Sequence, residues 1–155
     1  MHQLQRLDVS HALAIAELWA DGARESAHAA HLYMPNISIS AHADLIARQL
    51  AQQERLAWGA LSQHGQLLAY ITASIREAEV RYAPERYLKI HDLDVAVSAR
   101  RLGLGRQLVQ HLREFVRQEN LQAIEVNWII NDPVADAFWR SQGFQAFLYT
   151  AHQTL

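Results

Sequence analysis

The sequence contains no cysteine, and only six glycines and three prolines among 155 residues. Without cysteine the protein cannot form disulfides, thiolate zinc sites or a thiol nucleophile. Long hydrophobic runs are also absent, because stretches such as AIAELWA and LLAYITA are far shorter than the about 20 residues of a membrane helix. The N-terminus lacks the hydrophobic region of a signal peptide. We therefore expect no membrane segment and a cytoplasmic location.

The sequence also has no large excess of positive or of negative charge. The formal net charge is -2, which provides no general attraction to nucleic acid or to an anionic membrane. Any bound anion must then be held by local geometry. Histidine is abundant, with nine residues, but the only close pair, His28 and His31, lacks the spacing of a metal-binding motif. We expect no metal and no nucleic-acid partner.

The length and the hydrophobic content of 50% predict one globular domain over residues 1–155. Apolar periodicity predicts strands at 3–9, at 55–75 as a hairpin turning at His64-Gly65, at 87–97, at 123–130 and within 144–155. Helices are expected to begin at Ser10, at Ser40, after Gly105 and at Asp132, the last one ending at Gly143. This order predicts a mixed α/β fold, whose largely antiparallel sheet has one parallel crossover and is flanked by helices.

The strand expected at 87–97 is irregular. Its apolar residues change parity along the strand, from Leu88 and Ile90 to Leu93, Val95 and Val97. A regular strand keeps its apolar residues on one face, so either both faces are covered or a bulge near His91 and Asp92 shifts the phase. Bulges often lie beside active sites.

The stretch RRLGLGRQ, at 100–107, joins this strand to an amphipathic helix. A Walker loop is excluded because neither glycine precedes Lys and Ser or Thr. A dinucleotide-binding loop is disfavoured because Leu108 occupies the position of its third small residue. The pattern [Q/R]-x-x-G-x-[G/A] remains, in which backbone amides at a helix start hold an anion. A plain glycine turn before a helix is the alternative.

Two motifs in order carry a resemblance. The first is Leu93-x-Val95 followed by Arg100-x-x-Gly103-x-Gly105, and the second, about thirty residues later, is Asn131, Ala135 and Phe138-Trp139-x-x-x-Gly143-Phe144. Together they resemble the GCN5-related N-acetyltransferases, the GNAT superfamily, whose members bind acetyl-CoA. The resemblance implies a GNAT-like acyl-CoA N-acyltransferase fold for nearly the whole chain.

The resemblance also implies where acetyl-CoA would bind. Backbone amides at 101–106 would hold the pyrophosphate, the strand at 95–97 would pair with the pantetheine arm, and Asn131 and the helix from Ala135 would flank the end of that arm. The implied acetyl-CoA-binding residues are Val95, Ala96, Val97, Arg100, Arg101, Leu102, Gly103, Leu104, Gly105, Arg106, Asn131, Ala135 and Trp139.

The activity implied is direct transfer of acetyl to a primary amine of a small molecule or peptide, without a covalent enzyme intermediate. His91 is the expected base, because it lies two residues before Leu93, where family members often have Glu or His, and because its ordinary pKa is about 6.5. Tyr33, Asp92 and Asp94 are candidate substrate contacts.

Trp139 departs from the family pattern, which commonly has at this position a tyrosine that acts as the general acid. An indole N–H cannot deliver a proton at neutral pH, so either no acid is needed or another group, such as Tyr149, supplies it. The departure also leaves open an alternative function, a catalytically degenerate CoA-binding regulatory domain. A homodimer is an expectation from the family alone.

Overall fold

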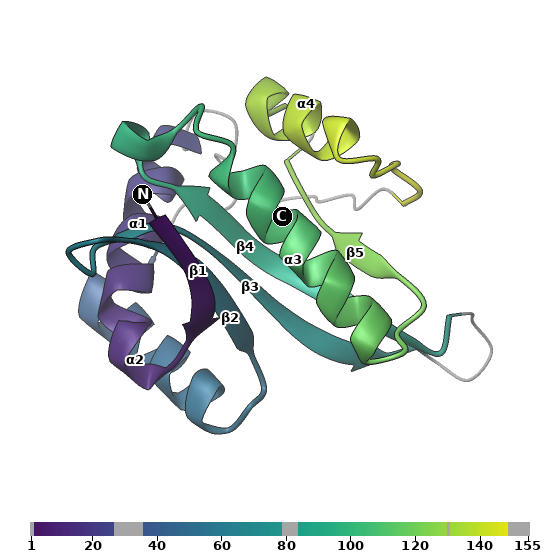
Figure 1. The fold of residues 1–155 in the computed structure, drawn as a ribbon, viewed down its shortest axis with the longest axis horizontal. Helices are drawn as coiled ribbons and strands as arrows, with labels where there is room; N and C mark the ends of the chain where they lie inside the picture. The colour runs from purple at the N-terminus through teal and green to yellow at the C-terminus, as the bar shows by residue number, and fades with distance from the viewer. Residues whose placement is uncertain (1, 27–35, 79–83, 130, 149–155) are drawn as a thin grey trace, which may run out of the picture.

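The computed structural model describes residues 2–26, 36–78, 84–129 and 131–148. A five-stranded sheet, with strands in the order β1 to β5, has helices on both faces (Figure 1). The strands are β1 (His2–Leu7), β2 (Leu56–Ser62), β3 (Leu67–Glu77), β4 (Arg86–Val95) and β5 (Ile124–Val126). The helices are α1 (Ala12–Ser26), α2 (Ile39–Ala51), α3 (Leu104–Gln118) and α4 (Pro133–Ser141), with 3-10 turns η1 (Val9–His11) and η3 (Val97–Ala99).

The strand directions confirm the predicted mixed α/β fold. Neighbouring strands from β1 to β4 are antiparallel, and β4 and β5 are parallel. Parallel neighbours need a crossover connection, and α3 provides it. The parallel pairing is short, from Leu88 with Ile124 to Ile90 with Val126.

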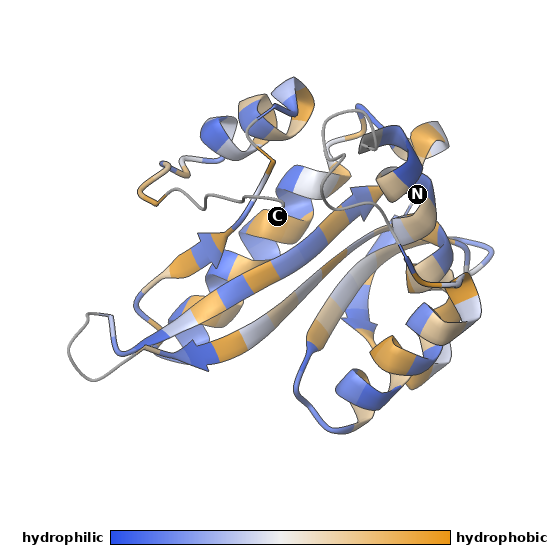
Figure 2. Ribbon diagram, turned by 180° about the vertical axis from the view of Figure 1, so that it is seen from behind, coloured by the Kyte–Doolittle hydropathy of each residue, from blue (hydrophilic) through white to orange (hydrophobic). Residues whose placement is uncertain are grey.

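The two faces of the sheet have separate hydrophobic cores. On one face α1 and α2 pack through Ile15 and Ile46 beside Tyr70 of β3. On the other face the apolar stripe of α3, which includes Leu108 and Leu112, packs against β2, β3 and β4. Figure 2 views the molecule from behind and shows hydrophobic and hydrophilic residues alternating along strands. β3 is covered on both sides, so a polar side chain on this strand needs a partner within the protein.

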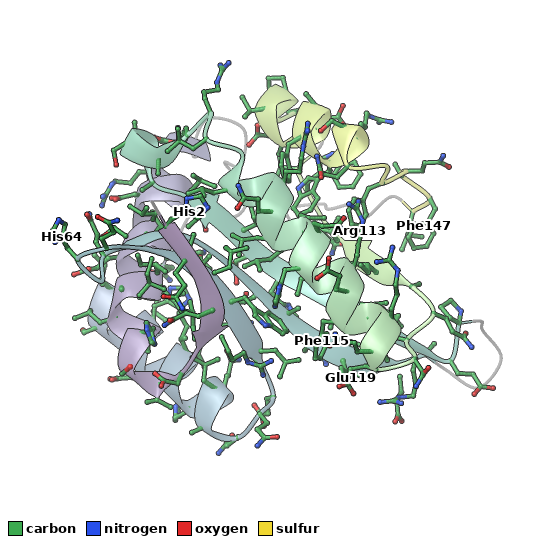
Figure 3. The ribbon with its side chains drawn as sticks, in the orientation of Figure 1. His2, His64, Arg113, Phe115, Glu119 and Phe147 are labelled. Carbon is green, nitrogen blue, oxygen red and sulfur yellow. The ribbon has the colours of Figure 1, made fainter. Side chains whose placement is uncertain are left out.

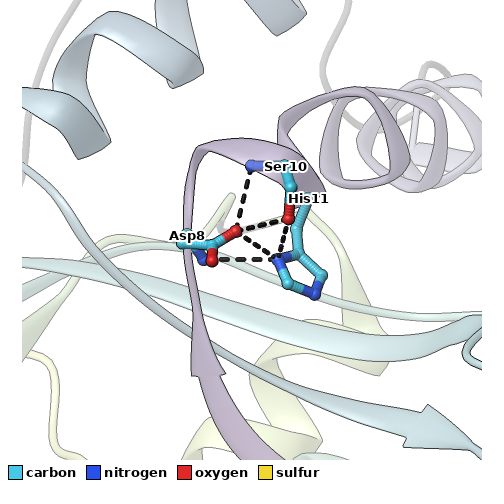
Figure 4. A network of polar contacts seen from close by, with 3 residues as sticks. All are labelled: Asp8, Ser10 and His11. Atoms are coloured by element: carbon cyan, nitrogen blue, oxygen red, sulfur yellow. Dashed lines mark hydrogen bonds and ion pairs between the residues drawn. The ribbon is translucent and has the colours of Figure 1, made fainter.

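The first two helices begin at other residues than predicted. Asp8, and not Ser10, caps the first helical turn, because its carboxylate accepts hydrogen bonds from the Ser10 backbone N–H at 2.9 Å and from the Ser10 hydroxyl (Figure 4). The α2 helix begins after Ser38, whose hydroxyl accepts from the Ala41 N–H at 3.2 Å. The prediction of Ser40 was therefore wrong by two residues, within a stretch that contains three candidate caps.

The C-terminal third differs from the prediction in two places. β5 covers only Ile124–Val126 of the strand expected at 123–130, and residues 144–148 form no strand. The remainder of the last predicted strand lies outside the described residues. Arg113 of α3 donates to the Gln142 carbonyl at the end of α4 and lies on the same side of α3 as Phe147 (Figure 3). The Gln142 carbonyl thus ties the end of α4 to a charged side chain of α3.

The predicted start of α4 is confirmed, and it generates a stability prediction. The Asp132 carboxylate accepts from the Val134 and Ala135 N–H groups, both at 3.0 Å, and Pro133 occupies the first turn. We expect Asp132→Ala to lower the free energy of unfolding by about 1 kcal/mol, because two amides lose their acceptor. Asp132→Asn, which keeps an acceptor oxygen, is the control and should lose much less. Urea denaturation measures both, and equal losses would contradict the capping account.

Candidate active site

A bulge in β4 determines which side chains reach the site. Thr72 of β3 pairs with Asp92, whereas Ala73 pairs with Ile90, so His91 is an extra residue. Of the two explanations that the change of parity left open, the bulge near His91 and Asp92 is the one present. Because of this extra residue, Leu93 and Val95 face the α3 core together with Ile90 and Leu88. The polar residues of β4 consequently face α1 and α2.

A row of three hydrogen bonds joins the polar residues of β3 and β4. The Tyr70 hydroxyl donates to Asp94 Oδ2 at 2.7 Å, and the Thr72 hydroxyl donates to Asp92 Oδ2 at 2.8 Å. Ser74 Oγ lies 2.7 Å from His91 Nε2. Tyr70, Thr72 and Ser74 alternate along β3 and therefore share one face.

Arg55, just before β2, supplies the positive charge next to this row. Its Nη1 lies 3.1 Å from Asp92 Oδ2, and both side chains are largely buried. The ion pair holds the Asp92 carboxylate in place. His42 of α2, which is buried and packs edge-on against Trp19 at 4.2 Å between ring centroids, lies on the same side of the sheet.

Burial raises the pKa of Asp94 and lowers the pKa of His91, so it favours the uncharged form of both side chains. The pKa of Asp94 is raised to about 7, mainly because the carboxyl is buried and to a lesser extent because of the nearby Asp92 charge, although the Tyr70 hydrogen bond opposes the rise. Burial, together with the positive charge of Arg55, lowers the pKa of His91 to about 4. At neutral pH His91 is therefore uncharged, and Asp94 is close to half ionised.

Gly22 lets α1 approach Asp94 closely. A Cβ atom built at Gly22 would lie 2.2 Å from Asp94 Oδ1, so any larger residue would collide with the carboxylate. Glycine in a helix interior is unfavourable, which makes this position a specific adaptation to the Asp94 side chain. The carboxylate is held between the Tyr70 hydroxyl and the backbone of α1.

A cleft of about 250 Å³ opens where β4 and β5 separate. The last pair of the parallel ladder is Ile90 with Val126, and beyond it the two strands line opposite walls. Residues 90–94 of β4 form one wall and residues 126–129 the other. Trp19, Gly22 and Ala23 of α1 close one end, and Asp132, Ala135 and Trp139 close the end at α4.

The glycine motif at 100–106 leads into α3, and no side chain caps the start of this helix. Gly103 adopts the left-handed conformation, with φ of 77°. The first helical bond runs from the Gln107 N–H to the Gly103 carbonyl, so the amides of the first turn lie beyond the helix ladder. A Cβ at Gly103 would meet only Gln107 Nε2, at 3.9 Å, so the space beside this backbone is open. These features suit an anion such as a pyrophosphate.

The second glycine has a different function. A Cβ at Gly105 would lie 3.3 Å from the ring of Phe138 in α4, so this glycine allows α3 and α4 to pack closely. Arg100 also serves the fold, because its Nε donates to the Val95 carbonyl at 3.2 Å and its Nη2 bonds Glu25 of α1. Only part of the predicted acetyl-CoA motif is therefore available to contact a ligand.

The structure places the other predicted residues as follows. Ala135 and Trp139 line the cleft, with Trp139 only 7% exposed and packed edge-on against Phe138 and Phe144. Asn131 is exposed and lies outside the cleft lining. Between β4 and α3 lie Ala96, Val97, Arg101 and Leu102, whereas Leu104 and Arg106 belong to the first turn of α3, where Leu104 is buried. β4 ends at Val95, so Val97 belongs to η3, and the strand expected to reach 97 was drawn two residues too long.

Two predicted residues, Tyr33 and Tyr149, lie outside the described residues. Several residues of the site were not predicted, namely Trp19, Gly22, Arg55, Tyr70, Thr72 and Ser74. The sequence holds one usable signal for them, because YITAS places three polar side chains at alternate positions of a strand that is otherwise apolar. Arg55 has no such signal, since its contact with Asp92 spans 37 residues of sequence.

Within the described ranges, no three His, Asp or Glu side chains are grouped as a metal site. None of the described helices combines the length and the hydrophobicity that crossing a bilayer requires. The site is thus built from a polar row, a cleft and an open helix start.

Solved structures share this fold at low identity. The BH1408 protein of Bacillus halodurans, solved as a tetramutant, has a TM-score of 0.87 at 14% identity, covering 99% of both chains. The aminoglycoside 6'-N-acetyltransferase AAC(6')-Ih of Acinetobacter baumannii has a TM-score of 0.78 at 17% identity, covering 100% of this chain and 98% of its own. A Clostridium acetobutylicum protein, described as a predicted acetyltransferase and solved with acetyl-CoA, has a TM-score of 0.77 at 14% identity, covering 99% and 96%.

No curated protein matches the sequence. The sequence model of the acetyltransferase (GNAT) family matches residues 14–144, which is most of the chain and includes the polar row, the glycine turn and α4. The resemblance seen in the two motifs is thereby confirmed, and the protein belongs to the acetyltransferase (GNAT) family.

Proposed function

We propose that the protein is an acetyl-CoA-dependent N-acetyltransferase that transfers acetyl directly to a primary amine of a small molecule or peptide. The observation that carries the proposal is the Asp94 carboxylate, which lines the cleft with a pKa raised by burial to about 7. A group that titrates at the working pH suits a general base. Family membership supplies the reaction class.

Acetyl-CoA fits the open start of α3 and the free edge of β4. The first-turn amides after Gly103 would hold the pyrophosphate, and the edge of β4 beyond Ile90, where pairing with β5 ends, would take the amide-bearing pantetheine arm. Trp139 and Ala135 would flank the acetyl end from α4. When bound, acetyl-CoA would supply the thioester, whose C–S bond breaks as the amine nitrogen forms the C–N bond. The sulfur would leave as a thiolate and take up the second amine proton, which the nitrogen loses on becoming an amide.

Asp94 is the residue to which we assign the base function. An incoming ammonium group gives one proton to the Asp94 carboxylate and becomes the nucleophilic amine, so the charges of both partners are neutralised together. Tyr70 holds Oδ2 by its hydrogen bond, and Oδ1 points to the backbone of α1 at Gly22. Asp92, paired with Arg55, keeps the region polar without adding a free charge.

His91, the base expected from the sequence, is less suitable for this step. A pKa of about 4 makes its imidazole a weak proton acceptor at neutral pH. Its hydrogen bond with Ser74 and its position in the cleft wall suit a neutral partner for the acceptor amine. No acid is required in this proposal, because an ordinary thiol has a pKa of about 8.5 and its thiolate is a good leaving group near neutrality.

The alternative is a CoA-binding regulatory domain that has lost catalysis, which the replacement of tyrosine by Trp139 would favour. Trp139 is a buried core residue packed between two phenylalanines. The change from tyrosine to tryptophan therefore removes a possible acid but leaves the wall of the cleft intact. Both functions predict that acetyl-CoA raises the melting temperature. Only the enzyme releases free CoA in the presence of an amine.

The base assignment predicts a specific pH dependence. The base acts in its ionised form, so kcat/KM of the wild type should rise as the pH passes through about 7. Asp94→Asn should lose about 100-fold or more in kcat and should lose this rise. His91→Ala should keep the rise near pH 7, because the pKa of His91 lies near 4. Release of free CoA across pH 5 to 9 is the measurement, and an Asp94→Asn enzyme with the wild-type rate would exclude Asp94.

The same variant should not lose its fold. The folded-state pKa of Asp94 lies above its unfolded value of about 3.9, so the stability linked to its protonation is present at low pH and is lost as the pH rises from about 4 through 7. Asparagine does not ionise. Asp94→Asn should therefore be at least as stable as the wild type at pH 8, which thermal melting will check.

The acetyl-CoA site predicts a difference between two glycines of similar conformation. Gly103 and Gly65 have φ of 77° and 79°, and a Cβ would meet little at either, so alanine should cost each position about 1 kcal/mol through backbone strain alone. Only Gly103→Ala should weaken acetyl-CoA binding, by about tenfold or more, because its methyl group would occupy the space for the pyrophosphate. Calorimetry measures both affinities, and equal affinities would place the cofactor elsewhere.

A further inference from the structure

The cleft combines tryptophan side chains with the Asp94 carboxylate, whose hydrogen-bond partner is the neutral Tyr70 hydroxyl. From this combination we infer that the acceptor is a small monocationic amine with an aromatic or similarly flat apolar body. The inference rests on the proposed acetyl transfer and names the substrate class that the same cleft would select.

The walls are rich in indole. The chain has four tryptophans, and three of them, Trp19, Trp128 and Trp139, line this one cleft. They come from three separate parts of the chain, namely α1, the segment after β5, and α4. The fourth, Trp58, packs in the core beneath α3, edge-on against Phe115. Indole faces attract flat apolar groups and cations, and tryptophan is the strongest aromatic partner of a cation.

Contacts outside the cleft hold these rings in place. Trp19 packs edge-on against His42, and the Trp128 indole N–H donates to Asp136 Oδ1 at 2.9 Å. Trp139 is fixed between Phe138 and Phe144. Rings that are already ordered lose little conformational entropy when a ligand binds, so they favour a rigid flat body over a flexible polar one.

The charge of the cleft matches a single ammonium group. Among the described lining residues there is no lysine or arginine, and the carboxylates are Asp92, Asp94 and Asp132. Asp92 is paired with Arg55, and Asp132 Oδ1 accepts from two amides at the start of α4. Asp94 is the carboxylate left for the substrate, because its hydrogen-bond partner is the neutral Tyr70 hydroxyl. A polyamine or an aminoglycoside would bring more positive charges than this one carboxylate can pair with.

The size of the cleft also limits the acceptor. Its volume of about 250 Å³ lies below the about 300 to 1,000 Å³ of common ligand pockets, and the acetyl thioester must share it. A one-ring amine with a short alkyl chain fits the remaining space better than an aminosugar antibiotic. This distinguishes the expected substrate from that named for the structurally similar Acinetobacter enzyme.

A substrate panel tests the inference. We expect kcat/KM for 2-phenylethylamine to exceed that for spermidine, for kanamycin and for a hexapeptide with a free N-terminal amine, each by about tenfold or more. It should also exceed that for n-propylamine, which has the same charge but no ring. A polycation or the peptide as the best substrate would overturn the substrate class and leave acetyl transfer standing. No acetylation of any amine would overturn both proposals, even if acetyl-CoA raises the melting temperature.

Variants of two tryptophans identify the contact. Trp19→Leu should raise KM for 2-phenylethylamine about tenfold and leave KM for acetyl-CoA unchanged, whereas Trp19→Phe should restore most of the loss. Trp58→Phe is the matched control outside the cleft and should change neither KM. If Trp19→Leu does not fold, Ala23→Leu, which narrows the same end of the cleft from an α1 position, should raise the same KM. An unchanged KM in the folded variants would overturn the assignment of Trp19.

Discussion

The extra residue in β4 allows one strand to serve a hydrophobic core and a polar site at once. In a regular strand Asp92 and Asp94 would point into the α3 core and Leu93 would point away from it. With His91 inserted, Leu93 stays in the core, and both aspartates face β3 residues that donate hydrogen bonds to them. Pairing with β5 ends at the same point, after Ile90. The insertion therefore places the polar row at the mouth of the cleft.

The polar row has a cost that its chemistry explains. Burial disfavours a charged carboxylate, and a glycine in a helix interior is less stable than alanine by about 0.5–1 kcal/mol. Both costs, the buried carboxylate and the helical glycine, occur together where Gly22 contacts Asp94. Burial also raises the pKa of this carboxyl to about 7. Groups that are unfavourable for folding yet titrate near neutrality are concentrated at active sites, because proton transfer requires them there.

The sequence predicted the fold and the crossover, and it offered the bulge as one of two explanations, because each leaves a local pattern. The change of parity between Ile90 and Leu93 is such a pattern, and so is the strand, glycine turn and helix around Gly103. The lowered pKa of His91 could not be predicted in this way, since it depends on burial and on Arg55, which lies just before β2. Asp8 and Ser10 are both residue types that commonly cap a helix. Which of them does so depends on the backbone geometry, which the sequence does not reveal.

The proposed acetyl-CoA site and the proposed acceptor site depend on different parts of the chain, the first on backbone and the second on side chains. Acetyl-CoA is expected to contact mainly backbone, at the start of α3 and the edge of β4, so its site needs glycine at Gly103 and an unpaired strand and little else. The proposed acceptor end depends on side chains of α1, β3 and the residue before β2, such as Trp19, which lines the cleft, and Tyr70 and Arg55, which hold Asp94 and Asp92. None of these belongs to the motif that identifies the family. A chain can therefore keep the cofactor site unchanged while these side chains select a different amine.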